Sequence, residues 1–344
     1  MSYKRRYIKL IALILCAALS LCLAGCGSGS GGAGGSGSAS GGSGSSASSS
    51  GDSSSGGSGS GSDSGDSSED SDFEPRWTWT EFLTPEHGDW VEGNELVSVD
   101  LSNCSEGYVM IEYMGSAANA VLQVSIPDGS ATYTYPILAG TQTFPLSCGD
   151  GTYKLVILEQ TNGDFYAVAY STSVDVTLND EFRPYLYPNE YVNYTSDCKS
   201  VALGMELSYS SSDDLGYVSN VYNYVIDNIT YDEAKAAGDL TYYVPDIDET
   251  LDTGTGICFD YASLMAAMLR SQRIPTKLVF GYSGTTYHAW VSVYLTEYGW
   301  VDGIIEFDGS SWELMDPTLG ANNGASDVAS YIGDGSNYTE KYWY

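Results

Sequence analysis

Three residues in the second half of the chain could together perform nucleophilic chemistry on an amide. Cys258 supplies a thiol, His288 an imidazole that can take up the thiol proton, and Asp316 a carboxylate that can orient the imidazole. Singly, such residues are commonly a buried thiol, a core histidine and a turn residue. The other histidine, His87, lies in TPEHGDW without such a context. The three together predict catalysis through a thioester.

The residues around Cys258 predict an α-helix within 253–275. Apolar residues follow Cys258 at offsets of three and four, namely Tyr261, Leu264, Met265, Met268 and Leu269. Thr255 is the predicted N-cap, and Pro275 prevents continuation of the helix. Cys258 is then in the first turn, where unpaired backbone N–H groups and the helix dipole stabilise a thiolate. The same N–H groups could hold an oxyanion.

The pattern downstream alternates, which predicts four antiparallel strands, KLVFGY, YHAWVSVYL, GWVDGIIEF and SWELMD. His288 opens the second strand, and Asp316 closes the fourth, directly before Pro317.

A second helix is predicted upstream, capped by Asp213 or Asp214. Its inward face would carry Val218, Val221, Tyr222, Val225 and Ile229. We expect this helix to pack near the helix that begins around Cys258.

Three sequence blocks surround the candidate residues: GICFDYASLMAAMLRSQRIPTKLVFGY, YHAW and W-x-L-M-D-P-T. These blocks resemble the signatures of bacterial transglutaminase-like proteins, which are relatives of the papain-type cysteine enzymes, over roughly residues 191–344. The resemblance implies an α+β fold with the cysteine helix packed on an antiparallel sheet. It also implies Cys258 as nucleophile, His288 as base and Asp316 as orienting acid. The implied reaction is transamidation, deamidation or hydrolysis of protein or peptide amides.

One departure from the family pattern affects the acid. The run GWVDGIIEFDG stands between the histidine strand and the DPT block, and a simple meander would place Asp316 two strands from His288. Two strand spacings are about 9 to 10 Å, too far for a hydrogen bond. Either the fourth strand lies directly beside the second, or Asp302 replaces Asp316. We favour Asp316, because Asp302 precedes Gly303 in no comparable motif.

Residues 1–26 predict an export signal, with four basic residues followed by the apolar run 10–23. The run is too short to span a membrane. Its end, LAGC, resembles the bacterial lipobox, which implies that Cys26 carries the lipid; an ordinary signal peptide is the alternative. We therefore expect an extracytoplasmic protein anchored in the cell membrane.

Residues 27–72 are nearly all glycine and serine and predict a flexible tether, with a root-mean-square span of roughly 35 to 40 Å. The formal net charge of the chain is −32, which makes nucleic acid a poor partner. We expect the partners to be protein or peptide substrates in the cell envelope, with the membrane bound through the lipid anchor.

Residues 73–188 show many short alternating runs, which predict an all-β sandwich, followed by the catalytic domain at 189–344. The sandwich tyrosines could line a carbohydrate or peptide groove, although packing between half-buried strands is the commoner role.

The remaining cysteines raise two possibilities. Cys104 and Cys148 both flank predicted strands and could form a disulfide, whereas Cys198 is left over. A disulfide between Cys198 and Cys258 would exclude the predicted mechanism.

We expect no cofactor or metal ion. Zinc binding by Cys258 and His288 lacks the usual ligand spacing. An acidic cluster precedes the cysteine helix and consists of Asp246, Asp248, Glu249 and Asp252. It might attract calcium, but its spacing is not that of an EF-hand, which favours a solvated loop.

Two alternatives to a transglutaminase-like activity stay open. A cysteine peptidase would use the same three residues, and a surface binding module would keep the fold without the activity.

Overall fold

The computed structural model describes residues 8–9, 76, 81–302, 304–307, 312–315 and 338–344. Apart from Ile8 and Lys9, the predicted signal, Cys26 and the tether 27–72 lie outside the described residues, as does Asp316. The described residues from 81 onward fall within one compact unit.

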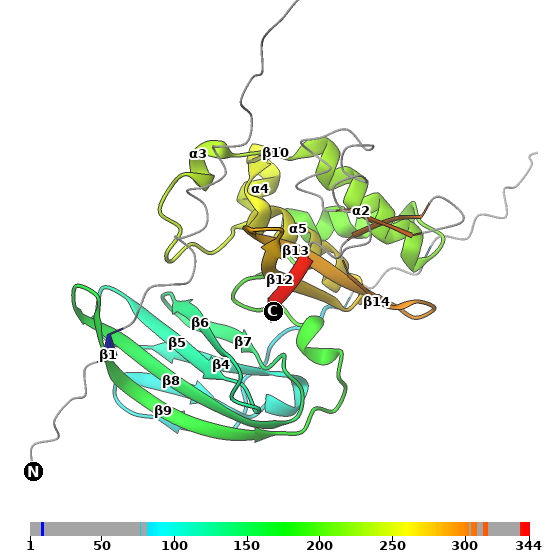
Figure 1. Cartoon of the computed structure of the whole chain (residues 1–344). Helices are drawn as coiled ribbons and strands as arrows, with labels where there is room; N and C mark the ends of the chain where they lie inside the picture. Colours follow the sequence, from blue (N-terminus) through cyan, green and yellow to red (C-terminus); the bar gives the residue numbers. More distant parts are fainter. Residues whose placement is uncertain (1–7, 10–75, 77–80, 303, 308–311, 316–337) are drawn as a thin grey trace, which may run out of the picture. The chain divides into compact units, whose positions relative to one another are not determined.

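Two antiparallel sheets form the first part of this unit (Figure 1). The strands are β1 (Ile8–Lys9), β2 (Val91–Gly93), β3 (Val97–Asp100), β4 (Tyr108–Tyr113), β5 (Ala120–Ser125), β6 (Thr132–Ile137), β7 (Thr141–Pro145), β8 (Gly151–Asn162) and β9 (Phe165–Val176). One sheet has the order β1-β9-β8-β5-β6, and the other has the order β2-β3-β4-β7. The 3-10 helices η2 (Cys104–Glu106) and η3 (Arg183–Tyr185) accompany the strands.

Alternation of buried and exposed side chains explains these strands, as predicted. In β8, for example, Tyr153, Leu155 and Ile157 are buried. Two predicted runs, 165–170 and 173–178, form the single strand β9. The sequence reading missed β2 and β7, because β2 has only three residues and β7 has one large apolar side chain, Phe144.

Five α-helices follow. They are α1 (Lys199–Tyr209), α2 (Asp214–Asn228), α3 (Glu233–Ala236), α4 (Ile247–Thr253) and α5 (Cys258–Ser271). The predicted helix α2 is confirmed: the Asp213 carboxylate accepts the Gly216 N–H at 2.7 Å as N-cap. The Tyr217 hydroxyl donates to the Met268 carbonyl of α5 at 2.8 Å, so α2 packs on the cysteine helix as expected. None of the helices in the described part of the chain is long and apolar enough to cross a membrane.

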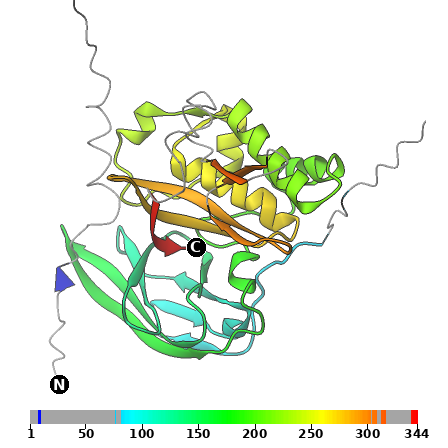
Figure 2. The ribbon, with the colours of Figure 1, turned by 45° about the vertical axis from the view of Figure 1, so that its right-hand side comes forward.

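Helix α5 lies on a four-stranded antiparallel sheet with the order β14-β13-β12-β17 (Figures 1 and 2). Its strands are β12 (Thr276–Ser283), β13 (Thr286–Leu295), β14 (Gly299–Asp302) and β17 (Tyr338–Trp343). This arrangement confirms the predicted α+β fold, in which the cysteine helix packs on an antiparallel sheet.

The strand order differs from a simple meander. The third predicted run is divided into β14 and β15 (Ile304–Phe307), and β15 pairs with β16 (Trp312–Met315) in a separate two-stranded sheet. Strand β12 pairs with β13 on one side and with β17 on the other, and β17 was not predicted from the sequence. The prediction of four successive strands was therefore wrong, because the inserted run contributes to two sheets.

One buried side chain, Arg270, connects the segments around α5. Arg270 donates to the backbone carbonyls of Thr276 at 2.8 Å, Tyr187 at 2.9 Å and Tyr344 at 2.5 Å. Burial lowers the pKa of Arg270 to about 10. These bonds fix the C-terminal end of α5 to chain segments that lie before and after it in the sequence.

Aromatic rings connect the N-terminal sheets to the same helix. The ring centroid of Tyr191 lies 5.3 Å from that of Tyr135 in β6 and 5.1 Å from that of Phe259 in α5. Tyr135 and Tyr191 are both buried. These tyrosines pack within the core, in agreement with the commoner of their two predicted roles. The domain boundary after residue 188 stays a prediction.

Candidate active site

Cys258 is the first residue of α5, and its side chain is half-buried. The N-cap is Ile257, so the prediction of Thr255 was wrong. Thr255 instead pairs with Thr230 in a short parallel ladder between β10 (Thr230–Tyr231) and β11 (Thr255–Gly256). The thiol stands at the end of a helix whose first N–H groups have no partner within the helix, a setting that stabilises a thiolate and a developing oxyanion.

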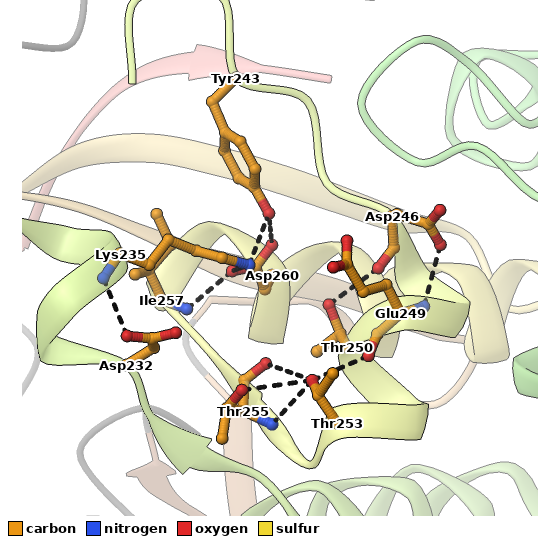
Figure 3. A network of polar contacts seen from close by, with 10 residues as sticks. All are labelled: Asp232, Lys235, Tyr243, Asp246, Glu249, Thr250, Thr253, Thr255, Ile257 and Asp260. Carbon is orange, nitrogen blue, oxygen red and sulfur yellow. Dashed lines mark hydrogen bonds and ion pairs between the residues drawn. The ribbon is translucent and has the colours of Figure 1, made fainter. Parts of the chain in front are cut away.

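The buried carboxylate of Asp260, two residues after the thiol, holds this helix start in place (Figure 3). Asp260 is 0% exposed, accepts the Ile257 N–H at 2.8 Å, and pairs with the Lys235 ammonium at 3.1 Å. The Tyr243 hydroxyl donates to the other carboxylate oxygen. Burial, reinforced by the hydrogen bond and charge of Asp260, raises the pKa of Tyr243 far above its ordinary value. The first turn of α5 is therefore anchored to segments up to 25 residues earlier.

A small residue is required beside this carboxylate. A Cβ atom on Gly256 would lie 2.7 Å from the Cβ of Asp260, closer than carbon atoms normally approach. The glycine that precedes Ile257 thus lets the chain pass close to Asp260. The sequence analysis overlooked Asp260, although an acid at the third helical position is a known capping signal. Its distant partners carry no sequence signal.

The acidic cluster ahead of α5 lies in helix α4 and at its N-cap, so the prediction of a solvated loop was wrong, and its carboxylates stabilise helix ends. Asp246 is the N-cap of α4 and accepts the Glu249 N–H at 3.0 Å (Figure 3). It also accepts the Asp248 N–H at 3.1 Å. Asp248 accepts the N–H groups of Lys199 and Ser200 at 2.9 and 3.0 Å. Asp252 forms an exposed ion pair with the Lys199 side chain at 2.5 Å. Within the described residues, no group of three or more His, Cys, Asp or Glu side chains is arranged to hold a metal ion.

His288 is the third residue of β13, paired with Gly281 of β12. Its ring centroid lies 6.2 Å from that of Trp290, with the planes 29° apart. Burial of the residue before it, Tyr287, raises the pKa of its hydroxyl well above the ordinary value. Helix α5 packs against β13. Successive side chains alternate along a strand, so His288 shares the face of Trp290.

The described strands decide between the two candidate acids only in part. Asp302 pairs with Ser292, four residues along β13 from His288, a backbone separation of about 13 Å. That is beyond the reach of the two side chains, so the register argues against Asp302. Asp316 directly follows β16 and lies outside the described residues, so its assignment remains a prediction.

The four described cysteines are all free thiols. The possible disulfide between Cys104 and Cys148 is therefore not formed in this structure; the Cys148 thiol donates instead to the Tyr133 hydroxyl at 3.2 Å. Burial raises the pKa of both thiols. Cys198 is the N-cap of α1 and does not pair with Cys258, so the candidate nucleophile keeps its thiol.

The Asp260 network gives a first prediction. We expect Asp260→Ala to lower the free energy of unfolding by about 3 to 5 kcal/mol, because Lys235 and Tyr243 lose their buried partner. Asp252→Asn is the matched control: it breaks the exposed pair with Lys199 and should change stability little. Urea denaturation measures the free energy of unfolding of both variants. Equal losses of stability would show that the buried contacts of Asp260 contribute no more than the exposed ion pair of Asp252.

Comparisons with known proteins agree with this architecture. Residues 202–302 match the family model described as the transglutaminase-like superfamily, a range that includes Cys258 and His288. The protein YebA of Bacillus subtilis (strain 168) is 23% identical over 290 residues, which cover 70% of this chain and 36% of YebA. The chain thus spans about a third of the length of this curated relative.

The solved structures that resemble this chain are only distantly similar to it. The periplasmic domain of TgpA from Pseudomonas aeruginosa is 16% identical, with 76% of this chain and 85% of that chain covered and a TM-score of 0.30. The transglutaminase of red sea bream is 14% identical, with 61% and 48% covered and a TM-score of 0.26. The family match rests on the sequence of residues 202–302, so this segment of the chain is similar to the transglutaminase-like superfamily.

Proposed function

We propose that this protein is an extracytoplasmic, lipid-anchored cysteine enzyme that acts on protein or peptide amides through a thioester. The observation that carries the proposal is the position of Cys258, a free thiol at the first residue of a buried helix within a transglutaminase-like domain. Asp260 and its partners hold that helix start rigidly, which is what a positioned nucleophile needs.

In the proposed reaction, the Cys258 thiolate attacks the carbonyl carbon of the amide, and N–H groups at the start of α5 stabilise the oxyanion. His288, protonated by the thiol, gives its proton to the departing nitrogen as the carbon–nitrogen bond breaks, which leaves a thioester. An amine or water then attacks the thioester and passes a proton to His288, and the thiolate leaves. Asp316 orients the imidazole throughout.

The proposed location follows from the N-terminal sequence. Cys26 in LAGC would carry the lipid, and residues 27–72 would let the folded part reach roughly 35 to 40 Å from the membrane. Substrates would then be proteins or peptides of the cell envelope.

The proposal is tested by amine incorporation. The wild-type protein or Cys258→Ala is incubated with envelope proteins and a biotin-labelled primary amine, and the products are identified by mass spectrometry. We expect amine-labelled or deamidated glutamine side chains with the wild type alone. Cleaved peptide bonds without incorporated amine would identify a cysteine peptidase instead. If the wild type leaves every substrate covalently unchanged, the protein is a binding module and the proposed activity is wrong.

A further inference from the structure

A cavity of about 270 Å³ lies away from the elements that carry Cys258 and His288. Its walls come from residues 82–85, from β4 and β7, and from the segment 188–196. Phe82, Leu83 and Met110 supply apolar surface, whereas Asn189 and Glu190 supply polar groups at buried positions. Among the described residues, no lysine, arginine or histidine lines it.

The side-chain amide of Asn189 has a fixed orientation and an unused donor. The residue is 3% exposed, and its Oδ1 accepts the N–H groups of Tyr191 at 3.0 Å and Val192 at 3.1 Å. These two bonds identify the oxygen, so the NH₂ group is on the other side. Its nitrogen, Nδ2, is buried without a hydrogen-bond partner.

Glu190 contributes an unused oxygen in the same way. The residue is 5% exposed, and its Oε2 accepts the Gln142 side-chain N–H at 2.5 Å. Gln142 is itself oriented, because its oxygen accepts the Leu138 N–H at 2.7 Å. The second carboxyl oxygen, Oε1, is buried and has no partner. Burial raises the pKa of Glu190 to about 8, so the carboxyl is largely protonated at neutral pH.

Buried polar groups are normally satisfied, and leaving one unpaired typically costs about 1 to 3 kcal/mol. Asn189 and Glu190 both line the cavity, and each holds a buried atom without a partner among the described residues, which indicates a ligand with complementary groups. We propose that this cavity binds an uncharged amide, whose carbonyl oxygen accepts from Asn189 Nδ2 and whose N–H donates to Glu190 Oε1.

The chemistry of the two residues argues against charged ligands. An ammonium group could pair with an ionised Glu190, but it would face the donor of Asn189 and leave it unsatisfied. A carboxylate would enter a cavity without a cationic side chain. An amide fits either protonation state of Glu190, because its carbonyl can also accept a hydrogen bond from the protonated carboxyl. Two sources share this chemistry, namely the carboxamide of an asparagine or glutamine side chain and the backbone peptide group.

Titration of the whole protein with small probes tests this proposal. The side-chain NH₂ signal of Asn189 is followed by ¹⁵N NMR while propionamide, N-methylacetamide, propionate or propylammonium is added. We expect a saturable shift with at least one amide and none with the two ions. Binding of propionamide alone would indicate a carboxamide side chain as the natural ligand, and binding of N-methylacetamide would indicate a backbone peptide group. Failure of both amides to bind, or equal binding of an ion, overturns the proposal.

Two variants separate the proposed contacts from general effects on folding. Asn189→Asp keeps an oxygen acceptor for the Tyr191 and Val192 N–H groups but lacks the donor, and should weaken amide binding about tenfold or more. Because this variant lacks the side-chain NH₂ group, binding is measured from the change in chemical shift of the probe molecule itself. Cys258→Ala should bind the amide like the wild type, so loss of the proposed catalytic function leaves this result unaffected. Unchanged binding by a folded Asn189→Asp variant would contradict the inference.

Discussion

The Cys258→Ala variant is expected to lose amide turnover almost completely, with kcat/KM lowered by about 10⁴-fold or more. The reason is that the variant has no group able to form the thioester, while substrate binding and the helix N-terminus remain. Steady-state kinetics on a substrate identified by amine incorporation measures the loss. The substitution removes one sulfur atom at a half-buried position, so the fold should persist.

The chain offers a matched control for this variant. Cys198 is also a free, half-buried cysteine at the start of a helix, where it is the N-cap of α1. Cys198→Ala should leave kcat/KM near the wild-type value, because no proposed step uses that thiol. If the two variants lost activity to the same degree, or Cys258→Ala kept most of it, the assignment of the nucleophile would be wrong.

The second large effect concerns stability and involves Glu190. Burial raises the pKa of this carboxyl from its ordinary value of 4.5 to about 8 in the folded protein. Between these two values the unfolded chain releases the proton while the folded protein retains it. The contribution of Glu190 to stability is therefore fully present below pH 4.5 and is lost as pH rises toward 8. The difference between the two pKa values corresponds to a change of at most about 5 kcal/mol in the free energy of unfolding.

Glu190→Gln should remove this dependence, because glutamine reproduces the uncharged form of the side chain. We expect the variant to match the wild type in acid and to be more stable by up to about 5 kcal/mol above pH 8. Urea denaturation across this range measures the difference. Glu95→Gln removes an exposed carboxylate and controls for the change in net charge. If the free energy of unfolding changed with pH in the same way for the wild type and Glu190→Gln, the buried carboxyl would ionise normally.

Local patterns made α2 and α5 predictable, whereas α1, α3 and α4 were not predicted. The apolar spacing after Cys258 identified α5, and Asp213 identified the start of α2, because both signals depend on neighbours within a few residues. The strands of the N-terminal sheets were predictable for the same reason, apart from the short β2 and the mostly polar β7.

Long-range pairing was not predictable. Nothing in GWVDGIIEF indicates that its two halves join different sheets, or that β17 pairs with β12 from nearly 60 residues away. Lys235 and Tyr243 meet Asp260 only because the chain folds back over α5. Asn189 and Glu190 also carry no sequence signal, since their unpaired atoms depend on the burial that folding imposes.

The central claim is that Cys258 is an activated nucleophile paired with His288. The most direct test is the rate at which iodoacetamide alkylates Cys258 at neutral pH, compared with Cys198 in the same molecule and followed by peptide mass spectrometry. We predict that Cys258 reacts at least about tenfold faster than Cys198 and that His288→Asn removes most of this advantage. Equal rates for the two thiols, or a fast reaction that does not depend on His288, would contradict the proposed mechanism.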